Sequence, residues 1–364
     1  MPILGVISSA GYQRIPNAPT IGTATGGNAS ATVTFTASGT GPVATSFTAT
    51  SSPSSITGTS ATSPITVSGL SNGTPYTFTV TATNASGTST ASAASNSITP
   101  AAPATPNVDY LVVAGGGGSY QPQNLCNGGG GGGGFQTGTS LAVSAGSPIT
   151  VTIGAGGSVA TDGSNSVFGA ITANGGGSGA PVQANGFNGG SGGGGGSGIT
   201  SGFSGGTGSQ GNNGGTGYSD GTTANRAAGG GGGAGAVGGN GTLGRGGNGG
   251  NGTASSYSGS SVTYAGGGGG AYRESSPGYG LGGSGGGGNA TYNANGVTQG
   301  TSGTANTGGG CGGDVSGGAG GSGVVVIRYA NTYPDATATT GSPTFTNTGG
   351  YKIYKWTGSG SVTF

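Results

Sequence analysis

Hydrophobic and polar residues alternate along three short segments, Thr32–Ala37, Ser63–Ser68 and Tyr76–Ala82. A period of two is typical of a β-strand with one buried face. Turn-forming residues separate the segments, so residues 16–100 are predicted to fold as an all-β sandwich. The inward positions are predicted to be Val33, Phe35, Ile65, Val67, Tyr76, Phe78 and Val80.

Continuous apolar runs follow at residues 108–114, 141–153 and 324–329. Runs of this kind predict buried strands, and the three are expected to pair into one small sheet. At the end of the chain, residues 351–364 contain a Gly-Ser-Gly turn between two apolar stretches. This pattern predicts a β-hairpin, with Trp356 in the core, that caps the sheet or pairs with a neighbouring chain.

Between the apolar runs, glycine recurs at every third position. Every triplet of residues 229–252 begins with glycine, and residues 186–200 and 202–219 keep the same phase. The left-handed extended helix has about three residues per turn, so one edge of it would carry no side chain. A neighbouring backbone can then approach that edge closely. The period predicts polyglycine II helices packed against one another.

Two alternatives to the bundle are a collagen-like helix and a disordered linker. Collagen needs proline to stiffen each strand, whereas residues 114–323 contain only Pro122, Pro148, Pro181 and Pro277. A disordered linker would not keep the glycine phase. The predicted fold class is mostly β: a sandwich, then a glycine-rich domain of polyglycine II helices clamped by a small β-sheet.

The composition shifts divide the chain into five segments. These are a leader at residues 1–15, the sandwich at 16–100, a proline-containing linker at 101–107, the glycine-rich domain at 108–329 and a hairpin cap at 330–364.

The sandwich resembles a fibronectin type III domain in the run Leu70-Ser71-Asn72-Gly73-Thr74-Pro75-Tyr76-Thr77-Phe78-Thr79-Val80. Tyr76 stands where that family keeps its tyrosine corner, and Leu70 lies six residues upstream. The sequence Asn84-Ala85-Ser86-Gly87 is similar to the family's turn into its last strand. The resemblance implies a fibronectin III-like β-sandwich that acts as a spacer.

The ends of the glycine-rich domain, VDYLVVAGGGG and GGSGVVVIRY, resemble the glycine-rich domain of tailed-phage virion proteins. The adhesins of T4-like long tail fibres are similar in using bundled polyglycine II helices whose tip loops read the host surface. The resemblance implies a virion protein, assembled in the host cytoplasm and displayed on a particle. A homotrimer is one arrangement consistent with a fibre.

The leader carries four apolar residues, Ile3, Leu4, Val6 and Ile7, and lacks the basic start of a signal peptide. It resembles the amino-terminal tags of tailed-phage structural proteins, which implies docking to other virion proteins. The alternative is an extra edge strand on the sandwich.

Charge is nearly absent from the chain. Among 364 residues there are 7 Lys and Arg, 6 Asp and Glu and no His, with a net charge of +1. This composition argues against a nucleic-acid footprint, and no run is long enough to insert into a membrane. Acid–base catalysis needs paired titratable groups, and no phosphate-binding lysine or metal-ligand spacing occurs. We expect neither an enzyme nor a cofactor.

Cys126 and Cys311 lie near opposite ends of the glycine-rich domain. The sequence leaves two readings open: a disulfide that closes the domain, or two buried thiols.

Loops that break the glycine phase concentrate the larger side chains, and these are the candidate receptor contacts. The candidates are Tyr257, Tyr264, Tyr272, Arg273, Tyr279 and Tyr292. The expected partner is a host cell-surface glycan or protein. The alternative is that the tyrosines only cover the ends of the bundle.

The sequence therefore predicts a non-enzymatic virion protein that displays an adhesion domain, with host attachment on a tail fibre as the leading role. A capsid decoration or head-fibre protein is the alternative. An ice-binding protein and a bacterial surface adhesin are further candidates, which the irregular side-chain pattern and the absence of a signal sequence disfavour.

Overall fold

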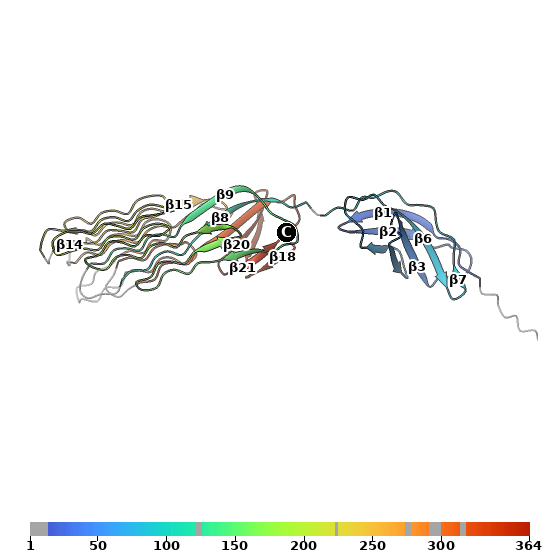
Figure 1. The fold of residues 1–364 in the computed structure, drawn as a ribbon, viewed down its shortest axis with the longest axis horizontal. Helices are drawn as coiled ribbons and strands as arrows, with labels where there is room; N and C mark the ends of the chain where they lie inside the picture. Colours follow the sequence, from blue (N-terminus) through green and yellow to red (C-terminus); the bar gives the residue numbers. More distant parts are fainter. Residues whose placement is uncertain are drawn as a thin grey trace, which may run out of the picture. The chain divides into compact units, whose positions relative to one another are not determined.

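The computed structural model describes residues 14–102, 104–120, 126–222, 225–273, 278–290, 300–313 and 318–364. The chain divides into two compact units, which meet in sequence at Ala104 and Thr105. The described residues form β-strands, turns and extended segments, so the predicted fold class is confirmed (Figure 1).

The first unit is a sandwich of two antiparallel sheets, with strand orders β1-β2-β5 and β4-β3-β6-β7. Its strands are β1 (Thr20–Gly27), β2 (Ser30–Thr36), β3 (Ser46–Ser52), β4 (Thr57–Ser60), β5 (Ile65–Ser68), β6 (Thr77–Asn84) and β7 (Gly87–Thr88).

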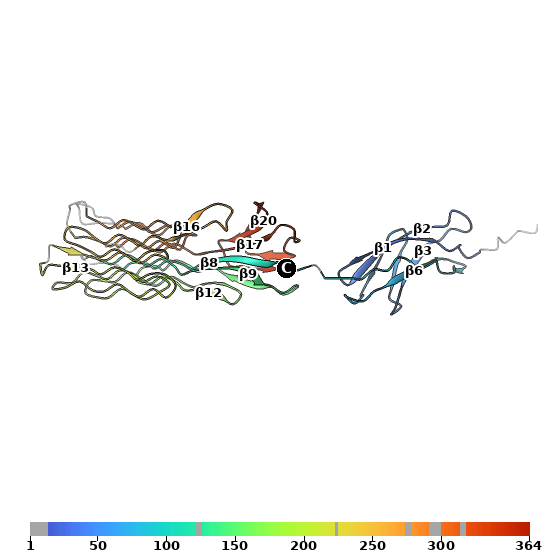
Figure 2. The ribbon, with the colours of Figure 1, turned by 90° about the horizontal axis from the view of Figure 1, so that it is seen from above.

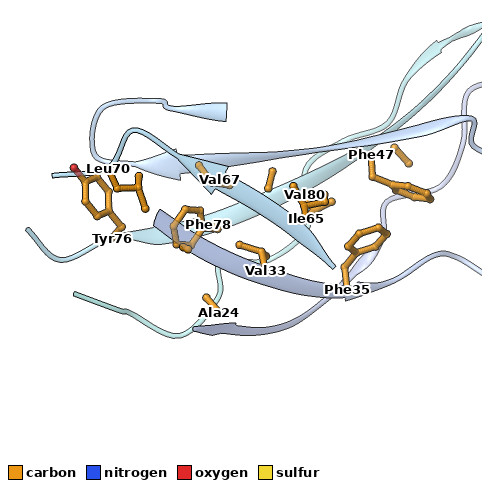
Figure 3. Packing of buried hydrophobic residues seen from close by; sticks show 13 residues of the cluster. Ala24, Val33, Phe35, Phe47, Ile65, Val67, Leu70, Tyr76, Phe78 and Val80 are labelled. Atoms are coloured by element: carbon orange, nitrogen blue, oxygen red, sulfur yellow. The ribbon is translucent and has the colours of Figure 1, made fainter. Parts of the chain in front are cut away.

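The sandwich core is formed by the predicted inward residues (Figure 3). All seven are buried, because every second side chain of β2, β5 and β6 faces the opposite sheet. The tyrosine corner is also present: the hydroxyl of Tyr76 accepts a hydrogen bond from the backbone N–H of Ser71 at 3.2 Å. This bond lowers the pKa of Tyr76.

A serine ladder closes the edge of β6. The backbone N–H groups of Ser89, Ser92 and Ser95 donate to carbonyls of β6, and their hydroxyls accept the N–H groups of the same β6 residues at 2.9–3.0 Å. Serines three residues apart thus pair with alternate residues of a regular strand. The sequence signal is Ser-x-x-Ser-x-x-Ser, which the alternation analysis missed.

The second unit contains two five-stranded sheets, ordered β19-β20-β17-β8-β9 and β12-β11-β10-β21-β18. The first has β8 (Asn107–Val113), β9 (Phe135–Ala142), β17 (Val324–Ala330), β19 (Thr344–Thr348) and β20 (Tyr351–Trp356). The second has β10 (Ile149–Thr152), β11 (Ser166–Phe168), β12 (Ile171–Ala173), β18 (Ala338–Thr340) and β21 (Gly360–Thr363).

Two sequence predictions about these sheets are wrong. Residues 141–153 form the end of β9 and all of β10, which belong to different sheets because a turn at Gly146 separates them. The predicted hairpin also separates: β20 pairs with β17 and β19, whereas β21 pairs with β10 and β18. Residues after 330 are therefore part of the clamp, and the Trp356 side chain, fully buried, donates its N–H to Thr340 of the other sheet at 2.9 Å.

Glycine-rich segments leave the sheets, turn and come back, forming the bundle seen in Figures 1 and 2. The segment of residues 128–134 shows how the bundle is held. Its N–H groups donate in rotation to the segments at 174–180, 229–232 and 308–311. Its carbonyls accept from three further segments, at 114–117, 191–194 and Gly268. A central helix thus has six neighbours and no room for any side chain.

Peripheral helices have fewer neighbours and keep glycine mainly on their inner edge. Asparagine side chains complete their hydrogen bonds. The Oδ1 atom of Asn185 accepts the N–H of Ser204 at 3.0 Å, and the N–H of Gly186 donates to the Ser204 carbonyl at 2.9 Å. We call this pair of bonds an asparagine clamp. Equivalent clamps are formed by Asn188 on Thr207, Asn240 on Thr216, Asn248 on Leu281 and Asn251 on Ser284.

Candidate functional site

The end of the bundle opposite the sheets exposes several of its larger side chains. Here lie β13 (Tyr218–Ser219) and β14 (Arg226–Ala227) (Figures 1 and 2). Ser219 donates its hydroxyl to the carbonyl of Ile199 at 3.0 Å, and Ala227 pairs with Tyr272. We call the described residues of these turns, at 197–202, 218–222, 225–227, 242–245, 272–273 and 278–279, the distal face.

Apolar side chains are exposed on the distal face. Leu243 is 62% exposed, Ile199 46% and Tyr279 37%. Backbone hydrogen bonds hold the turns that carry them: the N–H of Gly246, just after the Thr242–Arg245 turn, donates to the carbonyl of Gly278. The side chains are therefore presented on a rigid base.

The described distal face also carries three arginines, Arg226, Arg245 and Arg273, and the carboxylate of Asp220. Hydrogen bonds from Thr222, and then from Asn225, lower the pKa of Asp220. The Asp220 carboxylate accepts bonds of 2.6 Å from the Thr222 hydroxyl and 2.7 Å from the Asn225 amide. This carboxylate is thus occupied within its own turn.

Both cysteines are buried and neither forms a disulfide, so of the two sequence readings the buried thiols hold. The Cys126 thiol, beneath the distal face, donates to the carbonyl of Arg226 at 3.1 Å. Burial raises the pKa of Cys126 to about 12, an effect that the hydrogen bond with Ser197 and the nearby charges of Arg273 and Arg226 only partly offset. The Cys311 thiol donates to the carbonyl of Gly312 at 3.1 Å.

Two of the candidate tyrosines lie at the sheet end, on the hairpin of β15 (Thr253–Ser255) and β16 (Val262–Tyr264) (Figures 1 and 2). Tyr264 is buried among side chains of β8, β17 and β20, so its prediction as a surface contact is wrong. Tyr257 packs against the same cluster, and the guanidinium of Arg328 lies 4.1 Å from the centre of its ring. Tyr257 therefore stabilises the sheets that hold the end of the bundle.

Three other candidates come together on the distal face. Tyr272 is buried there and pairs with β14, which agrees with the alternative that tyrosines cover the bundle. Arg273 is half-buried, and its backbone N–H donates to the backbone carbonyl of Arg226 at 3.2 Å. Tyr279 is exposed. Tyr292 lies outside the described residues, as do the leader residues Ile3, Leu4, Val6 and Ile7.

Sequence reasoning missed two features of the bundle. The rings of Tyr120 and Phe187 lie 6.1 Å apart and nearly parallel, at 14°. Arg226 was not singled out, yet it is a buried charge beneath the distal face. Its signal in the sequence is the rarity of arginine within a glycine-rich domain.

Over the described part of the chain, no group of three or more His, Cys, Asp and Glu side chains could hold a metal ion. No helix among the same residues is both long and apolar enough to cross a membrane. The distal face offers hydrogen-bond donors, apolar surface and arginines, which are suited to binding.

Comparisons with known proteins agree with the two units. Residues 92–330 match the model of a family described as a glycine-rich domain, and residues 17–98 match that of the fibronectin type III domain, a binding type of fold. No curated protein matches the chain. Among solved structures, it is similar to the FN1-FN3 domains of chicken CNTN1, at 15% identity and a TM-score of 0.22, over 46% of this chain and 69% of that one.

Proposed function

This chain belongs to the glycine-rich domain family, and we propose that it is a non-enzymatic adhesion protein of a tailed-phage virion. The leader docks the chain to other virion proteins, the fibronectin III-like unit acts as a spacer, and the distal face contacts a host-surface glycan or protein. A tail fibre is the proposed location.

One observation carries the proposal: the largest exposed side chains at the distal end stand on turns that a backbone-only interior holds in place. Leu243, Ile199 and Tyr279 are exposed there, although large apolar side chains are normally buried. A bundle whose core contains no side chains leaves its surface residues free to vary without loss of fold. Such a scaffold suits a surface that must match a partner.

The test compares two aliphatic side chains that are almost equally exposed to solvent and lie at opposite ends of the bundle. Leu243 is 62% exposed on the distal face, and Val237 is 63% exposed near the sheet end, where Gly235 donates to Asn251 just before β15. We expect Leu243→Ser and Tyr279→Ala to weaken attachment of the purified chain to host cells several-fold. Val237→Ser should attach like the parent protein.

Each variant is first checked for an unchanged melting temperature. If Leu243→Ser, Tyr279→Ala and Val237→Ser all attach normally, the distal face is not the adhesive surface.

Location is tested separately by gold labelling of particles with an antibody against residues 16–100. Label at the tail supports the tail-fibre role, and label on the head makes the protein a capsid decoration. Deletion of residues 1–13 should leave a folded protein that no longer enters particles. Normal incorporation would place the docking surface elsewhere.

A further inference from the structure

Arg226 is a buried cation beneath the distal face. Its side chain and backbone together are only 3% exposed, and the Nε atom has no hydrogen-bond partner. A buried guanidinium without an anion is costly, because its hydration is lost and nothing replaces it. Arginines in such positions normally hold a carboxylate or phosphate through paired N–H groups.

The described carboxylates do not supply that anion. The ion pairs among the described residues join Asp109 to Arg328 and Asp335 to Lys352, and each of them involves a residue of the sheets. Asp162 accepts the N–H of Ser178 at 2.7 Å. Asp220, on the same turn as Arg226, is exposed and bonded to Thr222 and Asn225.

The surroundings of Arg226 favour an anion. The backbone N–H of Arg273 donates to the carbonyl of Arg226, so the two arginines lie on neighbouring segments, and the charges of both lower the pKa of the Cys126 thiol. Cys126, Ala228 and Ala271 form an apolar cluster beside them. Charge interactions are stronger in such a low-polarity setting than in water.

Exposed apolar surface is carried on a segment that is joined to the strands of the distal face. The hydroxyl of Ser219 bonds to Ile199, and Ser219 pairs with Arg226 in the β13–β14 ladder. The segment of the exposed Ile199 side chain is thus joined to the strand beside Arg226, so an acidic sugar ring bound against Ile199 would bring its carboxylate to these segments.

We propose that Arg226, with Arg273 beside it, binds the carboxylate of an acidic sugar at the distal face. This inference rests on the proposed adhesion to surface glycans and names the class of glycan. Arg273, which is half-buried, donates to the carboxylate, and the negative charge of the carboxylate also compensates the buried cation of Arg226.

Binding of the full-length purified chain to oligogalacturonate tests the proposal, with dextran as the neutral sugar and poly-glutamate as the acidic peptide. We expect binding to oligogalacturonate alone, weakened by salt. Arg226→Gln and Arg273→Gln should each weaken it about tenfold or more. Arg14→Gln is the control, since Arg14 is an exposed arginine of the first unit, outside the distal face, and it should retain the parent affinity.

If Arg226→Gln does not fold, the proposal is tested by the affinity of Arg273→Gln and by a thermal-shift assay of the parent chain. Galacturonate should raise the melting temperature, and glucose should not. Glu274 follows Arg273 in the sequence and is the rival anion. No binding by the parent chain, together with a lower melting temperature for Glu274→Gln, would show that Arg226 is neutralised within the chain.

Equal binding of poly-glutamate and oligogalacturonate would also overturn the sugar assignment and favour an acidic protein partner. The outcomes separate this inference from the proposed function. If cells are bound through Leu243 and Tyr279 but galacturonate is not bound, only the inference fails. Normal attachment by all distal-face variants removes the proposed function itself.

Discussion

In the sandwich, side chains such as Val33 and Phe78 fill the interior, whereas in the glycine bundle peptide groups fill it. The sandwich strands place every second side chain inside and leave the alternate ones outside. The helix at residues 128–134 instead donates to three neighbours and accepts from three, with no side chain on any side. One interior is held by apolar contact and the other by hydrogen bonds at close backbone approach.

The two interiors should therefore fail in opposite ways. Removing atoms from the sandwich core leaves a cavity, whereas adding atoms to the bundle core forces backbones apart. The surface of the bundle is correspondingly tolerant, because asparagine clamps hold residues such as Ser204 and Thr207 by their backbones alone. The contrast can be tested by substitutions in each unit.

The largest effect is expected for Gly130→Ala, in the central helix. The added carbon would overlap the carbonyl group of Gly117, which belongs to a backbone and cannot move aside. We expect a loss of more than about 4 kcal/mol in the free energy of unfolding, or no folded bundle at all. Denaturation followed by the fluorescence of Trp356, the only tryptophan, reports on this unit.

The adjacent pair Ser204 and Gly205 gives the matched control in a peripheral helix. A side chain on Gly205 would overlap the backbone of Gly214, whereas Ser204 is exposed. Gly205→Val should be severely destabilising and Ser204→Val nearly neutral. Equal tolerance at the two positions would contradict the backbone-packed interior.

The next largest effect belongs to the sandwich. Phe78 is fully buried between its sheets, and Phe78→Ala should cost about 3–5 kcal/mol because a cavity remains. Calorimetry should show the loss in the transition of this unit while the Trp356 transition stays in place. Thr79→Ala, on the other face of β6, is the control. A shift of the Trp356 transition by Phe78→Ala would mean that the two units do not unfold separately.

The sequence predicted the sandwich more completely than the bundle, for a physical reason. The period of two directly reports which side chains face the core, so Val33, Phe35 and Phe78 were placed correctly. Fibronectin-type turn residues added the tyrosine corner at Tyr76. The serine ladder was missed because a period of three along one edge is not a standard strand signal.

In the bundle, the glycine triplets predicted the type of helix but not which helix lies at the centre. Triplets mark peripheral helices, where one edge is covered; the central helix at 128–134 is glycine throughout and so has no phase. Phase breaks also look alike at both ends of the bundle. Tyr257 and Tyr264 were therefore grouped with Tyr279, although they belong to the sheet end.

A third prediction tests whether the backbone-packed interior is as dry as a hydrophobic core. Burial raises the pKa of Cys126 from 9.0 to about 12. Above pH 9 the unfolded chain releases this proton and the folded one keeps it, so stability falls as pH rises toward the folded pKa. The fall should reach about 1.4 kcal/mol per pH unit.

The measurement is the denaturant dependence of Trp356 fluorescence at several pH values between neutral and strongly alkaline. Cys126→Ser removes this proton, so the difference between the parent and the variant isolates it from the tyrosines. A difference that does not change with pH would show that water reaches the thiol.

The smallest effect is expected at the asparagine clamps, where the bundle meets water. The Oδ1 atom of Asn251 accepts the N–H of Ser284 at 3.1 Å, while Gly252 donates to the Ser284 carbonyl at 2.7 Å. Asn251→Ala removes one of these two bonds and leaves the other. Because water can partly replace an exposed partner, we expect a loss of about 1 kcal/mol.

Asn251→Asp sharpens this test, since a carboxylate keeps the acceptor oxygen in the same place and changes only the group beside it. It should retain the stability of the parent chain within about 0.5 kcal/mol, whereas Asn251→Ala should not. If alanine is as stable as aspartate, the clamp contributes nothing and the peripheral helices are held by their glycine edges alone. If aspartate is as damaging as alanine, the amide nitrogen matters, which the clamp geometry does not allow.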